Sequence, residues 1–179
     1  LVPQLGKVLV NGRDIHEDLR EWHAKLAYIP QTIYLIDDTL RRNIAFGVDD
    51  AKIDAARVEQ AIEQAQLRDL VAQLPEGLDT VVGERGVRLS GGQRQRVAIA
   101  RALYHEREFL ILDEATSALD AETEREIVRA MGALHGRKTL VVIAHKASVL
   151  ADADVVFHLQ GGRLESVERR SSAAAEPAP

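Results

Sequence analysis

A short apolar run that ends in two acids constrains the fold of this 179-residue chain more than any other feature. Residues 109–112 are continuously apolar, and Asp113 and Glu114 follow directly. Such a run is typical of a strand buried on both faces, as in a parallel sheet with helices on either side. In open α/β sheets, ligands bind beyond the carboxyl ends of the strands. The sequence therefore predicts an α/β fold that presents both acids at its ligand-binding edge.

Two adjacent carboxylates at such an edge can divide a chemical task. One can hold Mg²⁺, directly or through water, while its neighbour orients or activates an attacking water molecule. In isolation, an Asp-Glu pair is more commonly a pair of solvated acids at the end of a strand. The choice between these interpretations depends on what else the sequence brings to the same edge.

A second segment, about twenty residues earlier, has the form of a phosphate-binding helix start. Ser90, Gly91 and Gly92 come directly before a long amphipathic pattern. The first N–H groups of a helix are unpaired and lie at the positive end of its dipole, so they attract phosphate, and glycine lets the backbone approach closely. Ser-Gly-Gly is also ordinary loop and cap chemistry. Its occurrence shortly before the two acids favours the phosphate interpretation.

The rest of the chain alternates strand and helix patterns. Residues 8–10 precede an Asn11-Gly12 turn signal, which predicts a hairpin. We expect further strands at residues 26–29, 139–144, 155–159 and 163–167, and helices within residues 39–74, 91–104 and 121–134. The tail from residue 169, rich in Ser, Ala and Pro, is expected to be disordered.

Composition narrows the classes of function. The length suits one domain with a sizeable core, and a net charge of −5 gives no basic footprint, so no nucleic-acid partner is expected. The chain has no cysteine, which excludes disulfides and thiol chemistry. No apolar run approaches the ~18 residues that a membrane-spanning helix needs.

Five motifs in order resemble those of the nucleotide-binding (ATPase) domain of ATP-binding cassette (ABC) proteins, and the resemblance covers nearly all of residues 1–167. The matches in chain order are the Q-loop at Ile29-Pro30-Gln31, the signature motif at residues 89–93, the Walker B strand at residues 110–113 with Glu114 in the place of the catalytic glutamate, the D-loop at Ser117, Ala118, Leu119 and Asp120, and the switch-histidine segment at residues 142–145.

The resemblance implies a role for each matching side chain. Glu114 is implied to be the general base, with His145 and Gln31 as further catalytic residues and with Asp113 and Gln31 on Mg²⁺. An imidazole at position 145 can hydrogen-bond a γ-phosphate and stabilise developing charge. The signature residues Ser90, Gly91, Gly92 and Gln93 are implied to bind ATP that a second nucleotide-binding domain holds.

The resemblance also implies an architecture. We expect a P-loop NTPase-like ABC ATPase core, a mostly parallel sheet with flanking helices, built from residues 1–38 and 105–168. An inserted α-helical signature subdomain, residues 39–104, interrupts this core, and Gln31 lies at the hinge between them. Residues 169–179 form the expected disordered tail.

Another segment is similar to the exporter-type members of the family. Residues 80–86 resemble a stretch in which a glutamate, here Glu84, faces the coupling helices of the membrane domain. Residues 33–36 and 43–47 have a similar place near the transmembrane contact. The implied partners are a second nucleotide-binding domain, in a homodimer or heterodimer, and a transmembrane domain fused upstream. The implied location is the cytoplasmic face of a membrane.

The chain departs from the family in having no P-loop. That motif needs Gly-x-x-x-x-Gly-Lys-Ser/Thr, so that backbone amides wrap the phosphates and the lysine reaches them. Gly6-Lys7 is followed by Val8, and residues 136–139 have Arg137 where glycine is required. We therefore expect an exporter ATPase domain truncated at its N-terminus, active in the full-length parent and inactive alone. The alternatives are a soluble ABC ATPase acting on nucleic acid or ribosomes, and a non-catalytic or vestigial ABC protein.

Overall fold

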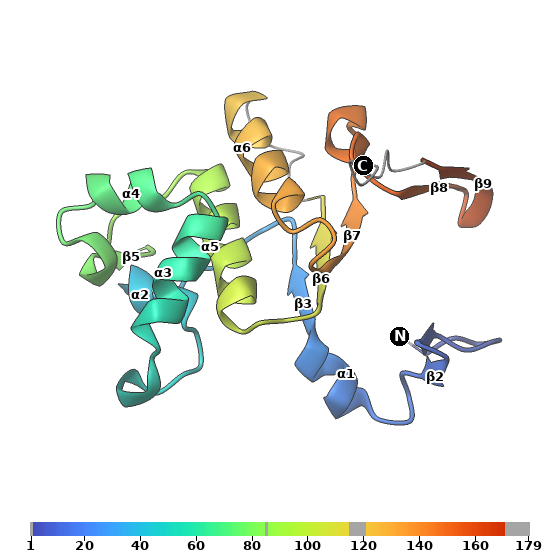
Figure 1. Ribbon diagram of the computed structural model, residues 1–179, viewed down its shortest axis with the longest axis horizontal. Coiled ribbons are helices and arrows are strands. Elements are labelled where there is room, and N and C mark those ends of the chain that lie inside the picture. The colour runs from blue at the N-terminus through green and yellow to red at the C-terminus, as the bar shows by residue number, and fades with distance from the viewer. Residues whose placement is uncertain (1, 85, 115–120, 171–179) are drawn as a thin grey trace, which may run out of the picture.

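The computed structural model describes residues 2–84, 86–114 and 121–170. At its centre lies a three-stranded parallel sheet in the order β3, β6, β7 (Figure 1). The central strand pairs in register with both neighbours, from Leu26↔Phe109 on one side to Asp113↔Ile143 on the other. Because all three strands run the same way, their carboxyl ends meet at one edge, as the α/β prediction requires. The strands are β3 (Leu26–Ile29), β6 (Phe109–Asp113) and β7 (Thr139–Ile143).

The longer helices gather on one side of this sheet (Figure 1). Next to the sheet lie α5 (Gly91–Tyr104) and α6 (Ala121–Gly132). The predicted 91–104 helix is confirmed residue for residue. Farther out, the predicted helical stretch of residues 39–74 is divided into separate short elements. These are α2 (Leu40–Ile44), η1 (Asp50–Lys52), α3 (Ala55–Gln64) and α4 (Arg68–Gln73), followed by η2 (Gly77–Asp79), with β4 (Asp38–Thr39) paired to β5 (Val81–Val82).

Two hairpins and one further helix complete the fold. Strands β1 (Leu9–Val10) and β2 (Arg13–Asp14) form the predicted hairpin, whose turn residues Asn11 and Gly12 both have positive φ, 51° and 79°. Helix α1 (Leu19–Lys25) then leads into β3. After η3 (Ala147–Leu150), strands β8 (Val155–Gln160) and β9 (Arg163–Arg169) pair antiparallel.

The ordered chain extends beyond the predicted start of the tail. Arg169 is the last residue of β9, and Arg170 donates to the carbonyl oxygen of Leu150 at 2.6 Å and to Glu168 at 2.8 Å. Strand pairing and these hydrogen bonds hold both residues in place. The rest of the predicted tail, residues 171–179, lies outside the described residues.

The hydrophobic core fills the space between the sheet and its helices. Leu110 and Leu112 of β6 are each 1% exposed, whereas Phe109 and Ile111, on the other face of the same strand, are only partly buried. On that face of the neighbouring β7, Val141 and Ile143 are each 47% exposed. The expectation that the Phe109–Asp113 strand is buried on both faces is therefore wrong for the described part of the chain, because α5 and α6 cover one face only. On the second face, α1 reaches the start of β6 through its Trp22, whose ring lies 5.1 Å from that of Phe109.

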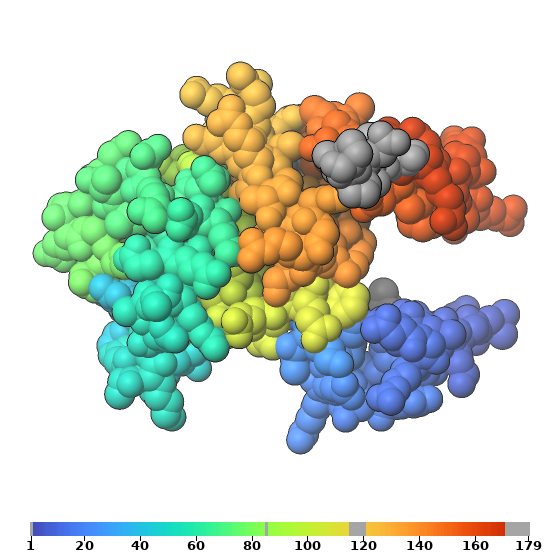
Figure 2. Space-filling model, viewed as in Figure 1, coloured from blue at the N-terminus to red at the C-terminus, as the bar shows by residue number. Residues whose placement is uncertain are grey.

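The space-filling view shows the two hairpins standing apart at one side of the molecule (Figure 2). The β1–β2 hairpin is at one end of that side and the β8–β9 hairpin at the other. Across the described ranges, no helix combines the length and the apolar character that crossing a membrane requires.

Candidate functional site

The two acids stand at the carboxyl end of the central strand. Asp113 ends β6, and Glu114 follows with a φ of 47°, in the left-handed region that residues other than glycine rarely adopt. The N–H group of Glu114 donates to the carbonyl oxygen of Ile143 at 2.9 Å, which keeps this turn attached to β7. The left-handed conformation costs on the order of 1 kcal/mol or more. Strained backbone of this kind occurs often at functional sites, so Glu114 is a candidate functional residue.

Side chains from both neighbouring strands contact the Glu114 carboxylate. Gln31, just after β3, donates from Nε2 to Oε2 at 3.1 Å. His145, just after β7, has its Nε2 3.1 Å from Oε1. The side chain of His145 is 80% exposed and that of Glu114 is 32% exposed, so the cluster is open to a ligand. The structure thus brings together three side chains that the sequence proposes as catalytic.

Tyr28 is a member of this edge that sequence reasoning missed. Its hydroxyl donates to Asp113 Oδ2 at 2.6 Å. This hydrogen bond raises the pKa of Tyr28 above its usual value, because ionisation removes the donor and sets two negative charges side by side. The strand register brings the two residues together, because Tyr28 pairs with Ile111, on the same face of the sheet as Asp113. Nothing in the local sequence reports that register.

The signature segment begins α5 with a reciprocal cap. The hydroxyl oxygen of Ser90 accepts from the N–H of Gln93 at 3.2 Å, and Gln93 Oε1 accepts from the N–H of Ser90 at 2.8 Å. This capping box satisfies two of the donors at the helix start. Among the described residues, the N–H groups of Gly91 and Gly92 have no acceptor. Gly92 is buried and Gly91 is partly exposed, so the N–H group of Gly91 is the donor that this helix start offers to an anion.

Gly92 also has a packing reason to be glycine. A Cβ atom at this position would lie 1.8 Å from Thr123 Cγ2 on α6, so the Thr123 side chain or one of the two helices would have to move. One turn further along α5, Arg96 forms an ion pair with Glu126 of α6 at 3.0 Å. These two contacts fix the start of the signature helix against α6.

The signature residues and Glu84 belong to segments of the chain separate from the strand ends that carry Asp113 and Glu114. In the described part of the chain, the side chain of Ser90 hydrogen-bonds within its own helix and not to Asp113 or Glu114. Glu84 is exposed in the bend that follows β5. The predicted D-loop residues Ser117, Ala118, Leu119 and Asp120 lie outside the described residues.

A groove of about 580 Å³ runs between β3 and the C-terminal half of α5. Tyr34 and Phe46 are exposed at its rim, by 82% and 47%. The Arg101 guanidinium lies 4.9 Å from the centre of the Phe46 ring, and burial lowers the pKa of Arg101. His105 Nε2 is 3.0 Å from the Phe46 carbonyl oxygen, and burial holds the pKa of His105 below its usual value. The groove is therefore apolar at its rim and cationic in its wall.

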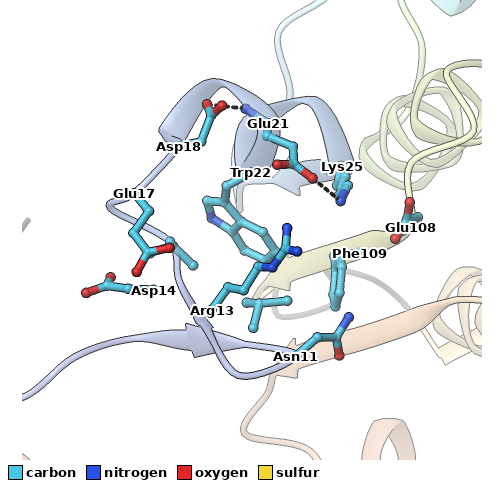
Figure 3. Close-up of a pocket in the computed structure, with 12 residues that line it drawn as sticks. Asn11, Arg13, Asp14, Glu17, Asp18, Glu21, Trp22, Lys25, Glu108 and Phe109 are labelled. Atoms are coloured by element: carbon cyan, nitrogen blue, oxygen red, sulfur yellow. Dashed lines mark hydrogen bonds and ion pairs between the residues drawn. The ribbon is translucent and has the colours of Figure 1, made fainter.

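A second hollow, of about 330 Å³, lies at the opposite end of the sheet (Figure 3). Its lining includes Trp22 of α1 and Phe109, the first residue of β6. Glu21 and Lys25, which form an ion pair at 2.6 Å, lie on its wall. Because ligands of parallel sheets bind beyond the carboxyl ends of the strands, this hollow at their amino ends is not part of the site.

The donor set at the acidic edge suits Mg²⁺ that arrives with a ligand. The described residues include no group of three or more His, Asp or Glu side chains able to hold a metal ion. Asp113 offers a carboxylate, and the Gln31 amide offers an oxygen, because its nitrogen donates to Glu114. Mg²⁺ commonly takes one or two protein carboxylates and completes its shell with water and phosphate oxygens. These residues therefore fit a shared metal site.

Comparison with known proteins agrees with this arrangement. The family model described as ABC transporter matches residues 1–117. The chain is 46% identical over 164 residues to the ATP-dependent lipid A-core flippase of Cupriavidus pinatubonensis, an alignment that covers 90% of this chain and 28% of that protein. It is 45% identical over 163 residues to the ATM1-type heavy metal exporter of Novosphingobium aromaticivorans, covering 90% of this chain and 26% of that protein.

A solved structure extends the likeness to three dimensions. The structure of a bacterial Atm1-family ABC exporter with ATP bound matches with a TM-score of 0.82 at 43% identity, over 93% of this chain and 29% of that one. The chain thus spans less than a third of the length of these relatives. The family match covers well over half of its residues and includes the signature helix and the acidic strand. The chain belongs to the ABC transporter family.

Proposed function

We propose that this chain forms the ATP-binding and ATP-hydrolysing part of an ABC exporter. One observation carries the proposal: both carboxylate oxygens of Glu114 are engaged at the ligand-binding edge, one by Gln31 and the other by His145. A base that must accept a proton from water needs its carboxylate held in a fixed orientation. Two contacts from two different strands supply that orientation.

Each residue at the edge has a distinct task in this proposal. Glu114 accepts the proton of the attacking water at a carboxylate oxygen. Gln31 keeps that carboxylate turned toward the ligand, and the exposed imidazole of His145 is placed to donate a hydrogen bond to a phosphate oxygen. Asp113 and the Gln31 amide oxygen would hold Mg²⁺, which neutralises phosphate charge when it is bound. Tyr28 steadies the Asp113 carboxylate through its 2.6 Å hydrogen bond.

The signature helix serves a nucleotide on a second nucleotide-binding domain. The N–H group of the partly exposed Gly91 is the donor for a phosphate, and the Ser90–Gln93 cap fixes the helix start that carries it. We propose residues 39–104 as the helical signature subdomain that carries this face, and residues 1–38 and 105–168 as the ATPase core. The 179 residues contain no P-loop motif, so tight ATP binding depends on residues outside this sequence.

The groove beside α5 is proposed as the docking place of a transmembrane domain. Its exposed aromatic rim at Tyr34 and Phe46 offers an apolar surface for a helix, and the exposed Glu84 offers a charge in the bend after β5. The relatives are described as a flippase and as an exporter, which supports a membrane partner and a place at the cytoplasmic face of a membrane. The transported molecule is selected by that partner.

The first prediction tests the proposed base. In the full-length transporter, Glu114→Gln should lower the rate of ATP hydrolysis by at least about 100-fold, because an amide cannot accept the proton. ATP binding, measured by calorimetry, should stay within a few-fold of the unaltered transporter. Glu106→Gln, which changes an acid outside the edge, is the matched control. Full hydrolysis by the Glu114 variant would rule out the assignment.

The isolated chain provides a second check on the same proposal. Titration of the 179-residue protein with MgATP in a calorimeter should give no binding in the micromolar range, since the phosphate cradle is absent from its sequence. Micromolar affinity would mean that these residues build a nucleotide site of a different kind, and the proposal would fail in its present form.

A further inference from the structure

One buried acid links two parts of the site that are far apart in sequence. Glu124 lies in the first turn of α6, four residues after Asp120, and is 8% exposed. Within the described ranges it is the only charged residue buried to this degree. A buried carboxylate needs partners that compensate for its lost hydration. The identity of those partners shows what the acid holds together.

Both oxygens of Glu124 are occupied by one short segment. Lys146 Nζ donates to Oε2 at 2.5 Å, and the hydroxyl of Ser148 donates to Oε1 at 2.6 Å. The hydrogen bond from Lys146, followed by that from Ser148, holds the pKa of Glu124 below its usual value, so the carboxylate is ionised at neutral pH. Charge-assisted hydrogen bonds of this length are among the stronger polar contacts in proteins.

The segment that Glu124 holds is the one that carries His145. Strand β7 ends at Ile143, and η3 begins at Ala147, so His145 lies in the short stretch between them. Its imidazole is 80% exposed, which means that side-chain packing does not set its position. The backbone sets it instead. One end of the stretch is fixed by the Glu114–Ile143 hydrogen bond, and the other end is fixed by Glu124 through Lys146 and Ser148.

We propose that Glu124 is a positioning residue for His145. By holding Lys146 and Ser148 against α6, it keeps the His145 imidazole at Glu114 Oε1 and so keeps the base and the phosphate-facing histidine in one arrangement. The inference rests on the proposed function for the catalytic meaning of His145. The tether itself is a property of this chain and can be tested without nucleotide.

Packing of α6 does not depend on the tether. Ile127, Ala130 and Met131, on later turns, bury the helix against the core. Glu126, two residues after Glu124, forms its ion pair with Arg96 of α5 and not with the His145 segment. Glu126→Gln is therefore a matched control for hydrogen exchange, because it makes the same chemical change on the same helix at a residue whose partner is Arg96.

The first arm of the test measures the tether in the 179-residue chain. Amide hydrogen exchange over residues 144–148 should become at least several-fold faster in Glu124→Gln and in Lys146→Gln. It should be unchanged in Lys146→Arg, which can form the same ion pair, and in Glu126→Gln. Thermal melts identify any variant that fails to fold, and the two single variants stand in for each other in that case. Unchanged exchange in a folded Glu124 or Lys146 variant would overturn the proposal.

The second arm measures the consequence in the full-length transporter. Glu124→Gln should lower kcat for ATP hydrolysis by roughly 10- to 100-fold with little change in KM, because displacing a catalytic group by about 1 Å can cost that much rate. Lys146→Arg should retain kcat. A raised KM with normal kcat would assign Glu124 a general structural role. An unaltered transporter without ATPase activity would refute the proposed function, while the exchange arm would still decide the tether.

Discussion

At the scale of single residues, the partial burial of His105 makes the stability of the folded chain depend on pH. Burial lowers its pKa, which outweighs the opposing hydrogen bond to the Phe46 carbonyl oxygen. The unfolded chain therefore binds a proton near pH 6.5 that the folded chain resists. The stabilising effect of neutral His105 is complete above about pH 6.5 and is lost as the pH falls from there toward the lower folded pKa.

The loss of stability at lower pH can be measured. The urea midpoint of the chain should fall between pH 7.5 and pH 5.5, and it should fall less in His105→Gln, whose amide can still donate to the Phe46 oxygen but cannot be protonated. The two proteins differ only at position 105, so the difference between the two slopes isolates His105. Identical slopes would show that its burial has no energetic consequence.

The close packing of Gly92 against α6 predicts that a larger side chain at this position lowers stability. Gly92→Ala places a Cβ atom against Thr123 Cγ2 and should lower the free energy of unfolding by about 1–3 kcal/mol. Thr123→Ser removes that methyl group, and the double variant should regain most of the loss. Gly132→Ala is the control, because no atom lies within 4 Å of a Cβ built there. Urea unfolding measures all four proteins, and a failure of the serine variant to rescue would place the conflict elsewhere.

At the scale of elements, sequence patterns succeeded where the determining signal is local. The start of α5 was predicted correctly because its N-cap, Ser90, directly precedes the helix in the sequence. The pattern over residues 39–74 was periodic throughout, yet Gly47 and Gln66 adopt positive φ, 83° and 56°, and separate the helices there. A left-handed glutamine has no strong sequence signal.

The same distinction applies to the site. Gln31, Glu114 and His145 were predictable, because each lies within two residues of the end of a strand and within a motif that resembles those of the family. Tyr28 and Glu124 were not, since their partners lie 85 and 22 residues away and depend on strand register and helix placement. Contacts of that kind are products of the fold and are absent from any local pattern.

At the scale of the whole molecule, the uncovered face of the sheet dominates the expected behaviour of the chain. Val141 and Ile143 expose 47% each, and β7 is an edge strand within the described residues. An apolar face beside an open strand edge is a template for association. We therefore expect the isolated chain to self-associate reversibly as its concentration rises.

Sedimentation velocity tests this expectation. Val141→Lys combined with Ile143→Lys should shift the chain toward the monomer, because charge on the face opposes its burial. Val81→Lys, a similarly exposed valine on the distant β5, should leave the association unchanged. A monomer at every concentration for the unaltered chain would mean that this face is masked in solution.

The left-handed backbone at Glu114 affects how the thermal stability of the chain can be raised. Glycine adopts a φ of 47° without the steric penalty that glutamate bears there. Glu114→Gly would therefore relax the turn, while the part-exposed contacts it gives up contribute little to folding. A screen that rewards heat resistance alone would favour this replacement and discard the proposed base. At this position, a gain in stability would cost the proposed catalytic activity.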